Sequence, residues 1–512
     1  MTSDAPARST RALCWAAAAC IGLSLLIMFV MALNGPSVIA EALKHAGSGP
    51  PWWHPLHLRD TLILLSLWAA AVIATAGVIF GLVAVARGAR PSIKLMIGVS
   101  LGATAIFTVL LPAGSTDAIS YAIDGSMVVA GHNPYVMTPD QFLKVGGTIA
   151  QYSSPTWRQS LSDYGPLATA SEWLAVKLSG GQLATMTFWL KLWAGLSFGA
   201  VVLLLDWLLR ADAVMRRRAH LLWSLNPLLI WEIVAAGHID GLAVAFGLAG
   251  IGLLWTKRPG TPDSAPAESV GLARAAIAGV LIGVAICVKL PFAVYAIGAA
   301  WMLRRQLAAF AAAAAGCLIV AVPSFAVAGT GAVTVYFKRG NGVTWDNLYQ
   351  VFWRPFNLNA TYEPNRLTDI AAVLTVALAV LLIMRLPQRS PRWPAVPLAL
   401  SLSLAWIFLW PFQRPWYDVM IIGLLALYPA SRLDWVVLGR LGFAGITYMD
   451  AVNIPGHTHL AQLQHVEGEW ITSVARLIAV IALVWLCITG RWGWRSSTSE
   501  TSATAPELQP LK

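Results

Sequence analysis

Long apolar runs separated by short polar connections dominate the chain from end to end. A helix of about 20 residues crosses the roughly 30 Å hydrocarbon core of a bilayer, and many of these runs approach that length. The runs lie at residues 12–34, 61–86, 93–112, 183–209, 219–236, 239–256, 273–288, 290–303, 306–328, 368–385, 395–411, 416–430, 434–450 and 472–490. The pattern therefore predicts an all-α polytopic membrane protein with about 12–14 transmembrane helices.

Three of the runs are short, and they begin at residues 290, 416 and 434. Each fits either a full span or one part of a broken or re-entrant helix. Broken helices are tolerated at membrane depth where they line a cavity, so both interpretations stay open for these segments.

The composition agrees with a lipid environment. Hydrophobic residues make up 57% of the 512 positions and charged residues only 12%, against about 25% charged in soluble domains. A soluble globular protein is therefore excluded. The five cysteines all lie inside apolar runs and form no CxxC motif, which predicts neither a disulfide framework nor a zinc site.

The net charge of +11 would suggest nucleic acid if it were spread over a soluble surface. Instead, Lys and Arg are concentrated in alternate connections, at residues 8–11, 87–94, 210–218, 257–274, 304–305, 385–392, 432 and 491–495. This distribution is the positive-inside pattern of a multi-pass protein of the plasma membrane with a cytoplasmic N-terminus. The predicted partner is thus the lipid bilayer and not nucleic acid.

The same orientation places three long connections, residues 113–182, 329–367 and 451–471, on the extracytoplasmic side. Loops of this length in a compact bundle are usually functional, and the first is predicted to contain a short helix over 167–178. We interpret residues 1–490 as a single transmembrane domain. The Ser/Thr-rich residues 491–512 are predicted to form a disordered cytoplasmic tail.

Asp117 is the first candidate for chemistry, because it stands where the third apolar run meets the outer surface. A carboxylate at such a boundary is partly desolvated and still reachable from water, which suits a general base. The alternative is that Asp117 simply caps the helix that follows.

The other candidates are individually ambiguous. His132 and Tyr135, like Asp163 and Tyr164, stand in turn sequences, and the cation of Lys289 fits either phosphate binding or a snorkelling lysine. Their gathering on one side of the membrane nevertheless predicts a functional cavity. The predicted substrate-binding residues are Tyr121, Asp124, His132, Tyr135, Asp163, Tyr164, His238, Asp240, Lys289, Trp345, Arg414, Trp416 and Tyr417. No metal ligand is predicted, and a divalent metal cofactor is left open.

Several of these residues belong to an ordered series of short motifs. The series runs Ser115–Tyr121, Gly131-His-Asn-Pro-Tyr135, Tyr164-Gly-Pro-Leu167, Asn226-Pro-Leu, Gly237-His-Ile-Asp240 and Val288-Lys-Leu-Pro291. In this order and spacing the motifs resemble those of the actinobacterial polyprenol-phosphomannose-dependent α-1,6-mannosyltransferases, which are GT-C membrane enzymes. The resemblance covers about residues 100–420, most of the chain.

The resemblance implies a GT-C-like bundle with an extracytoplasmic active site in which Asp117 is the catalytic acid. It implies an inverting mannosyl transfer from a polyprenyl-phosphate-mannose donor to an α-1,6-mannan or lipomannan-type glycolipid acceptor, by a monomer. Two alternatives remain: a GT-C transferase for another lipid-phosphate sugar, such as arabinose or glucose, and a lipid-sugar flippase or transporter. A flippase requires ionisable residues near the membrane midplane, where only Lys191 and Asp206 are expected.

Overall fold

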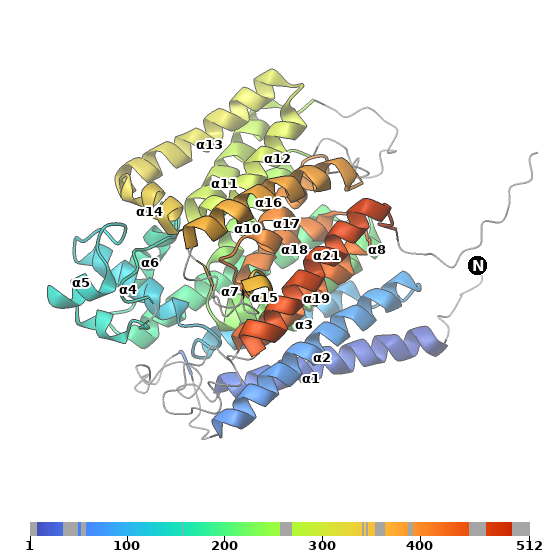
Figure 1. The fold of residues 1–512 in the computed structure, drawn as a ribbon, viewed down its shortest axis with the longest axis horizontal. Coiled ribbons are helices and arrows are strands. Elements are labelled where there is room, and N and C mark those ends of the chain that lie inside the picture. Colours follow the sequence, from blue (N-terminus) through green and yellow to red (C-terminus); the bar gives the residue numbers. More distant parts are fainter. Residues whose placement is uncertain are drawn as a thin grey trace, which may run out of the picture.

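The computed structural model describes residues 8–33, 43, 50–52, 58–155, 157–255, 269–339, 343–344, 347–353, 364–387, 393–449 and 467–493. The regular elements within these ranges are helices (Figure 1). The first half contains α1 (Arg8–Leu33), α2 (Asp60–Ala86), α3 (Ile93–Val109), α4 (Asp117–Val129), α5 (Pro139–Lys144), α6 (Pro166–Leu178), α7 (Leu183–Leu208), α8 (Ala213–Ala219), α9 (Pro227–Leu229) and α10 (Asp240–Leu253). The second half contains α11 (Leu272–Val288), α12 (Ala293–Leu303), α13 (Leu307–Ala328), α14 (Gly331–Arg339), α15 (Gln350–Trp353), α16 (Pro364–Arg385), α17 (Val396–Leu409), α18 (Asp418–Leu427), α19 (Leu433–Met449) and α21 (Ser473–Thr489).

The predicted class, a multi-pass helical membrane protein, is confirmed. Within the described ranges, 6 helices are long and apolar enough to cross a bilayer, namely those of α1, α2, α7, α13, α16 and α21. One further pair, Pro227–Ala235 and Asp240–Leu253, is bent by 113° and passes the same test only when its two parts are taken together. Several other predicted spans form apolar helices of 10–17 residues. The runs counted as spans from hydropathy are therefore not all full-length crossings.

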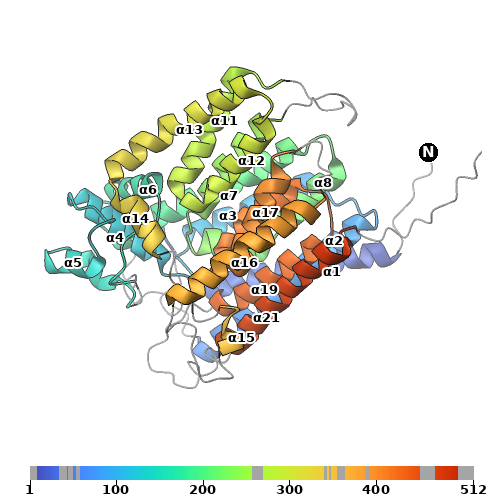
Figure 2. The ribbon, with the colours of Figure 1, turned by 45° about the horizontal axis from the view of Figure 1, so that its top comes forward.

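Close backbone approach holds two of the long helices together. A Cβ atom on Gly279 of α11 would lie 1.9 Å from the carbonyl oxygen of Ala313 on α13, and one on Gly316 would lie 2.1 Å from that of Ala276. Small residues at such contacts let membrane helices pack without a hydrophobic driving force between them. This contact fixes α11, whose C-terminal end carries Lys289. On the opposite flank, α16, α17, α19 and α21 run side by side (Figure 2).

The connection at residues 113–182 folds into a small helical layer at one end of the bundle, with α4 packed on α6 (Figure 1). The predicted helix over 167–178 is confirmed as α6. Much of the connections at 329–367 and 451–471, and most of the tail at 491–512, lies outside the described residues.

The two charges expected near the midplane have structural partners. The ammonium group of Lys191 is fully buried and donates to the carbonyl oxygens of Phe107, Leu110 and Leu111 at 2.6, 2.6 and 3.0 Å. The last carbonyls of a helix have no partner within it, so Lys191 completes the end of α3. Asp206 accepts a hydrogen bond from Arg216 at 2.6 Å. Both charges are thus engaged by groups of the protein itself.

Candidate active site

One face of α4 forms the floor of a polar pocket. Asp117, Ser120, Tyr121 and Asp124 line it, and their spacing of three, four and seven residues places them on one side of a helix. Tyr121 is fully buried, while Asp117 and Asp124 are each 8% exposed. The pocket is partly open to solvent.

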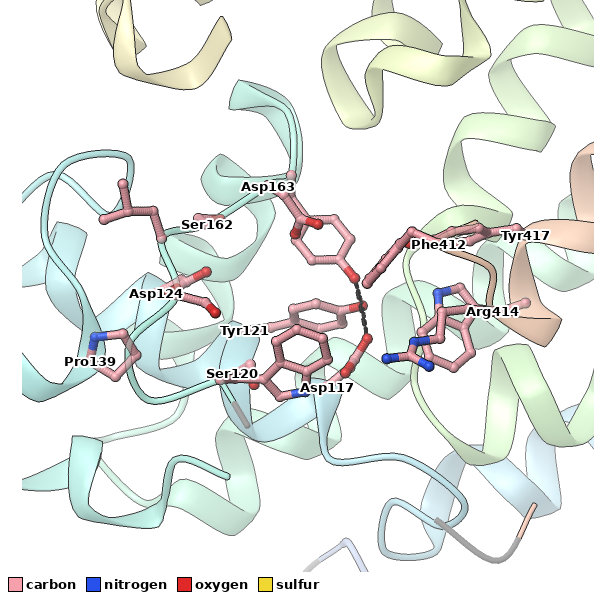
Figure 3. Close-up of a pocket in the computed structure, with 15 residues that line it drawn as sticks. Asp117, Ser120, Tyr121, Asp124, Pro139, Ser162, Asp163, Phe412, Arg414 and Tyr417 are labelled. Carbon is pink, nitrogen blue, oxygen red and sulfur yellow. Dashed lines mark hydrogen bonds between the residues drawn. The ribbon is translucent and has the colours of Figure 1, made fainter. Parts of the chain in front are cut away.

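The rest of the pocket comes from two other parts of the chain, residues 139–164 and the turn between α17 and α18 (Figure 3). The further lining residues are Pro139, Trp157, Ser160, Leu161, Ser162, Asp163, Tyr164, Phe412, Arg414, Trp416 and Tyr417. Segments almost 300 positions apart in the sequence thus meet around Asp117, and only the tertiary fold brings them together.

Asp117 does not cap its own helix. The N-cap residue of α4 is Thr116, with no side-chain capping bond, so the capping interpretation is wrong. Instead, the Oδ2 atom of Asp117 accepts a hydrogen bond from the Tyr164 hydroxyl at 3.2 Å. The Tyr121 hydroxyl donates in turn to that of Tyr164 at 2.8 Å and lies 3.5 Å from the same carboxylate oxygen (Figure 3).

His238 supports the other side of the carboxylate. Its Nδ1 atom donates to the backbone carbonyl of Glu232, so Nε2 faces the site, 3.1 Å from the Ser115 hydroxyl and 3.5 Å from Asp117 Oδ2. The imidazole also stacks on Trp416, with 3.8 Å between ring centroids. A ring held on both its edge and its face keeps one orientation toward the acid.

The backbone places His238 at the corner of the bent pair. Gly237 adopts a φ of +81°, in the left-handed region that glycine enters without a steric cost. The chain turns there between the π-helical segment Ile230–Ala235 and α10. The break expected of a helix that lines a cavity is therefore the feature that delivers the imidazole.

These neighbours keep Asp117 ionised. Burial alone raises the pKa of its carboxyl, but the hydrogen bond and charge of His238, with the charges of Arg414 and Lys289, more than offset this and hold the pKa below its ordinary value of 3.8. Burial and nearby carboxylates raise the pKa values of Tyr121 and Tyr164 well above 10, so both remain neutral donors. Asp117 is thus an anionic carboxylate at neutral pH.

Two cations flank the carboxylate, and neither is a surface charge. Lys289 is 4% exposed and donates to Asp240 Oδ1 at 2.7 Å, which rules out the snorkelling interpretation. Its ammonium lies over the rings of Tyr417 and Tyr164, 4.2 and 4.9 Å from their centroids. Arg414 is 8% exposed and lines the pocket.

The tight turn at Tyr164–Pro166 depends on its glycine. The amide of Gly165 donates to the carbonyl of Val288 at 2.9 Å, and a Cβ atom on it would lie 2.1 Å from the carbonyl oxygen of Cys287. The turn is therefore pressed against the end of α11. This contact brings Tyr164 next to Lys289.

The turn that carries Arg414 and Trp416 is fastened from behind by a buried arginine. Arg440 of α19 pairs with Asp418 and donates to the Gln413 side chain at 2.9 Å and to the Ile407 carbonyl at 3.1 Å. One guanidinium thus links the end of α17, the turn and the start of α18. Charge-assisted bonds to a rigid fork give such a turn a defined geometry.

The structure brings most of the predicted site residues together. Those that line the pocket are Asp117, Tyr121, Asp124, Asp163, Tyr164, Arg414, Trp416 and Tyr417. His238 and Lys289 contact these residues from outside the lining, and Asp240 pairs with Lys289.

Two predicted residues lie elsewhere, and one lies outside the described residues. His132 and Tyr135 line a separate lateral cavity beside the end of α13, and the Tyr135 hydroxyl bonds to that of Thr169 at 2.8 Å. Trp345 falls outside the described residues.

Sequence reasoning missed several lining residues. Ser120 had a usable signal, since it stands three residues after Asp117 on the same helical face. Ser115, which contacts both His238 and the Asp117 amide, stands two residues before Asp117 in the chain. Trp157, Ser160, Ser162 and Phe412 carry no local signal, because only the fold brings them to the pocket.

Within the described residues, no group of three or more His, Cys, Asp or Glu side chains is arranged to hold a metal ion. The groups around Asp117 are an imidazole, two neutral hydroxyl donors and two cations. Together with the carboxylate, such a set can accept a proton and stabilise a developing anion.

The fold and the site together define a multi-pass helical membrane protein with a buried acid–base pocket at one end of its bundle. The chain belongs to the α-(1→6)-mannopyranosyltransferase family, because residues 17–305 match the model of that family's N-terminal domain. Over 189 residues it is 30% identical to α-(1→6)-mannopyranosyltransferase B of Corynebacterium glutamicum. That alignment spans 35% of this chain and 29% of the relative.

Among solved structures, the chain is similar to the crystal structure of ArnT from Cupriavidus metallidurans bound to undecaprenyl phosphate. The alignment has a TM-score of 0.40 and 14% sequence identity, and it covers 78% of this chain and 77% of that one. A similarity at this level is too low to support a conclusion by itself.

Proposed function

We propose that this protein is an inverting mannosyltransferase that moves mannose from a polyprenyl-phosphate-mannose donor to the 6-hydroxyl of an α-1,6-mannan or lipomannan-type glycolipid. The observation that carries the proposal is the state of Asp117. It is a buried carboxylate held in its anionic form, hydrogen-bonded and oriented, at the centre of a pocket in a membrane-embedded member of this family. A general base must be unprotonated and within reach of the proton that it accepts.

The stereochemistry requires one base and one displacement. Conversion of a β-linked mannosyl phosphate into an α-mannoside inverts the anomeric carbon in a single in-line step. The acceptor oxygen forms a bond to that carbon as its proton passes to Asp117. The bond from the carbon to the phosphate oxygen breaks at the same time, and its electron pair leaves with the polyprenyl phosphate.

The leaving phosphate gains negative charge, and the pocket has cations to receive it. Arg414 lines the pocket, and Lys289 lies behind the rings of Tyr417 and Tyr164. Preorganised charges in a site that excludes water stabilise such an anion more strongly than they do in bulk solvent. In our proposal these two residues bind the phosphate, while His238 holds Asp117 in position.

The active site in this proposal faces the extracytoplasmic side, and the N-terminus is cytoplasmic. The basic connections at 87–94, 210–218 and 304–305 support this orientation through the positive-inside rule. They lie at the ends of α3, α7 and α12 that point away from the pocket, since Asp117 follows the opposite end of α3. A lipid-linked donor suits a pocket at the membrane edge.

The test is mannose transfer from purified polyprenyl-phosphate-mannose to a short α-1,6-mannoside by the purified protein, with Asp117→Asn and Asp117→Ala as variants. We expect transfer by the wild type and a loss of about 10²–10⁴-fold in both variants. Donor binding and thermal stability of the variants should match those of the wild type. Transfer that survives both substitutions would remove Asp117 as the base.

The acceptor product also discriminates among the alternatives. Transfer of arabinose or glucose, but not mannose, would keep the mechanism and change the donor. Movement of the lipid-linked sugar across a vesicle membrane with no glycosidic product would replace the transferase by a flippase.

A further inference from the structure

The pocket has two ends that differ in charge. Arg414 lies on one side of Asp117 and Asp124 on the other, with Asp163 above them in the view of Figure 3. The charges that lower the pKa of Asp117 are His238, Arg414 and Lys289. The wall away from Arg414 is the acidic end, formed by Asp124 and Asp163 together with the hydroxyls of Ser120 and Ser162 (Figure 3).

A third carboxyl group stands behind the acidic end. Glu172 of α6 is fully buried, and neither of its carboxylate oxygens has a hydrogen-bond partner within the described part of the chain. Burial is the main cause that raises its pKa well above 4.5, and the carboxylates of Asp124 and Asp163 add to it. A Cβ atom on Gly125 would lie 2.5 Å from the backbone oxygen of Glu172, so α4 presses directly on α6 there. Asp124 and Asp163 therefore lie close enough to Glu172 for their charges to act on it through the wall of the pocket.

The distance from Asp117 to the acidic end suits a saccharide. Asp117 and Asp124 are two helical turns apart, which is about 10 Å along the axis of α4. An acceptor whose reacting hydroxyl lies at Asp117 therefore extends its following unit past Ser120 toward Asp124. Carboxylate and serine oxygens accept hydrogen bonds from sugar hydroxyls, whereas they repel a second negative charge in this poorly solvated space.

On the basis of the proposed function, we propose that the acidic end is the acceptor subsite and that it selects neutral, hydroxyl-rich acceptors against anionic ones. Asp124 and Asp163 bind hydroxyl groups of the unit next to the reacting sugar. The same carboxylates exclude an acceptor that carries a carboxylate or phosphate at that position. Selection thus combines an attractive and a repulsive element in one wall.

The first test needs no variant. Two acceptors are compared that differ only in charge: an α-mannoside with a short aglycone ending in a carboxylate, and the same mannoside ending in a carboxamide. We expect the wild type to use the neutral acceptor at least about 10-fold better in kcat/KM. Equal use of both acceptors, or a preference for the anionic one, would overturn the proposal.

The second test assigns the selectivity to residues. Asp124→Asn and Asp163→Asn should raise the acceptor KM by about 10-fold, because each replaces a charge-assisted hydrogen bond by a neutral one. In the double variant that carries both substitutions, kcat/KM for the neutral acceptor should exceed that for the anionic acceptor by no more than about 3-fold. The KM for the lipid-linked donor should stay within about 2-fold of the wild type, since the donor phosphate is assigned to the other end.

Asp140→Asn is the matched control. Asp140 lies in the same loop but outside the pocket lining, where it pairs with Lys144 on the surface. It should leave both KM values and the charge preference unchanged. If Asp124→Asn behaves like this control, or raises the donor KM instead of the acceptor KM, the assignment is wrong.

Acceptor binding without donor separates this proposal from the proposed function. Calorimetric titration of the wild type with each mannoside measures the subsite even if no mannose is transferred. A wild type that transfers nothing but binds the carboxamide acceptor more tightly than the carboxylate one would refute the proposed donor and retain the subsite. Transfer of mannose with no charge preference in binding or turnover would retain the proposed function and refute the acceptor subsite.

Discussion

Two buried ion pairs at opposite ends of the bundle show how this protein treats charge where it needs stability and where it binds a ligand. Far from the pocket, Arg218 forms two bonds to Asp434, at 2.8 and 2.6 Å, and two more to the carbonyls of Leu425 and Tyr428. Beside the pocket, Lys289 forms one bond to Asp240, whose second carboxylate oxygen has no partner within the described residues.

The difference lies in how completely the charges are satisfied. Arg218 joins α8 to the start of α19 and the end of α18 and makes hydrogen bonds through all three of its guanidinium nitrogens. The Lys289 ammonium lies over two aromatic rings, and among the described residues only one of its three N–H donors forms a hydrogen bond, to Asp240. A buried pair that is complete contributes to structure, whereas an incomplete one near a pocket is able to respond to an added anion. Exposure alone does not distinguish them, because both pairs are buried.

The largest effect is expected at Arg218. Arg218→Met leaves Asp434 buried without its cation, which should lower the free energy of unfolding by about 3–5 kcal/mol. Thermal unfolding in detergent measures this. Arg218→Met combined with Asp434→Leu should recover most of the loss, and kcat of the folded fraction should remain that of the wild type. Failure of the double variant to recover stability would contradict a purely structural pair.

The corresponding pair at the pocket should behave differently. Lys289→Met is expected to reduce mannose transfer by about 10²-fold, since one charged group facing the leaving phosphate is lost. Adding Asp240→Leu should restore thermal stability, because no buried charge remains, but it should not restore activity. Recovery of activity together with stability would show that Lys289 acts only through folding.

The turn beside Lys289 gives a smaller effect. Gly165→Ala should destabilise the protein by about 1–3 kcal/mol and reduce activity, because the new methyl group overlaps the Cys287 carbonyl and displaces Tyr164. Gly439→Ala in α19 is the control, since nothing lies within 4 Å of the added Cβ atom. That substitution should be neutral or slightly stabilising. Equal effects in both variants would argue against tight packing at Gly165.

The smallest effect is expected from pH in the wild type. A general base works in its anionic form, so activity falls on acidification only when the pH approaches its pKa. The lowered pKa of Asp117 therefore predicts that kcat/KM is not limited by this group between about pH 7 and pH 5. His238→Gln removes a cause of the lowering, so the acidic limb should move to higher pH. The linked stability has the same sign: it is present above 3.8 and is lost as the pH falls through the lower folded value.

The sequence was most informative where a property depends on neighbouring residues along the chain. Apolar runs predicted the helical membrane class, and the short helix over 167–178 followed from local pattern. The ordered motifs predicted the family to which the chain belongs. Asp117, Tyr121 and Asp124, which were candidates from the sequence, all line the pocket from one face of α4.

The sequence was least informative where a residue's role depends on distant partners. From the sequence, Lys289 fitted a snorkelling side chain as well as a phosphate-binding one, because its partner Asp240 is 49 positions away. His132 and Tyr135 were expected in the same cavity as Asp117, yet they line a neighbouring one. The interpretation of Asp117 as a helix cap was local and wrong, since Tyr164 and His238 engage the carboxylate instead.

By itself, then, the sequence determined the solvent of this protein, its helical class and its family. The solvent and the helical class follow from side-chain transfer energies and helical periodicity, which act over a few residues, and the family follows from the ordered motifs. Only the tertiary structure decided that Arg414 lines the pocket, that Lys289 pairs with Asp240, and that the ring of Trp416 stacks on His238. Coulomb energies and hydrogen bonds depend on distances of a few ångströms between side chains, and only the folded chain sets those distances.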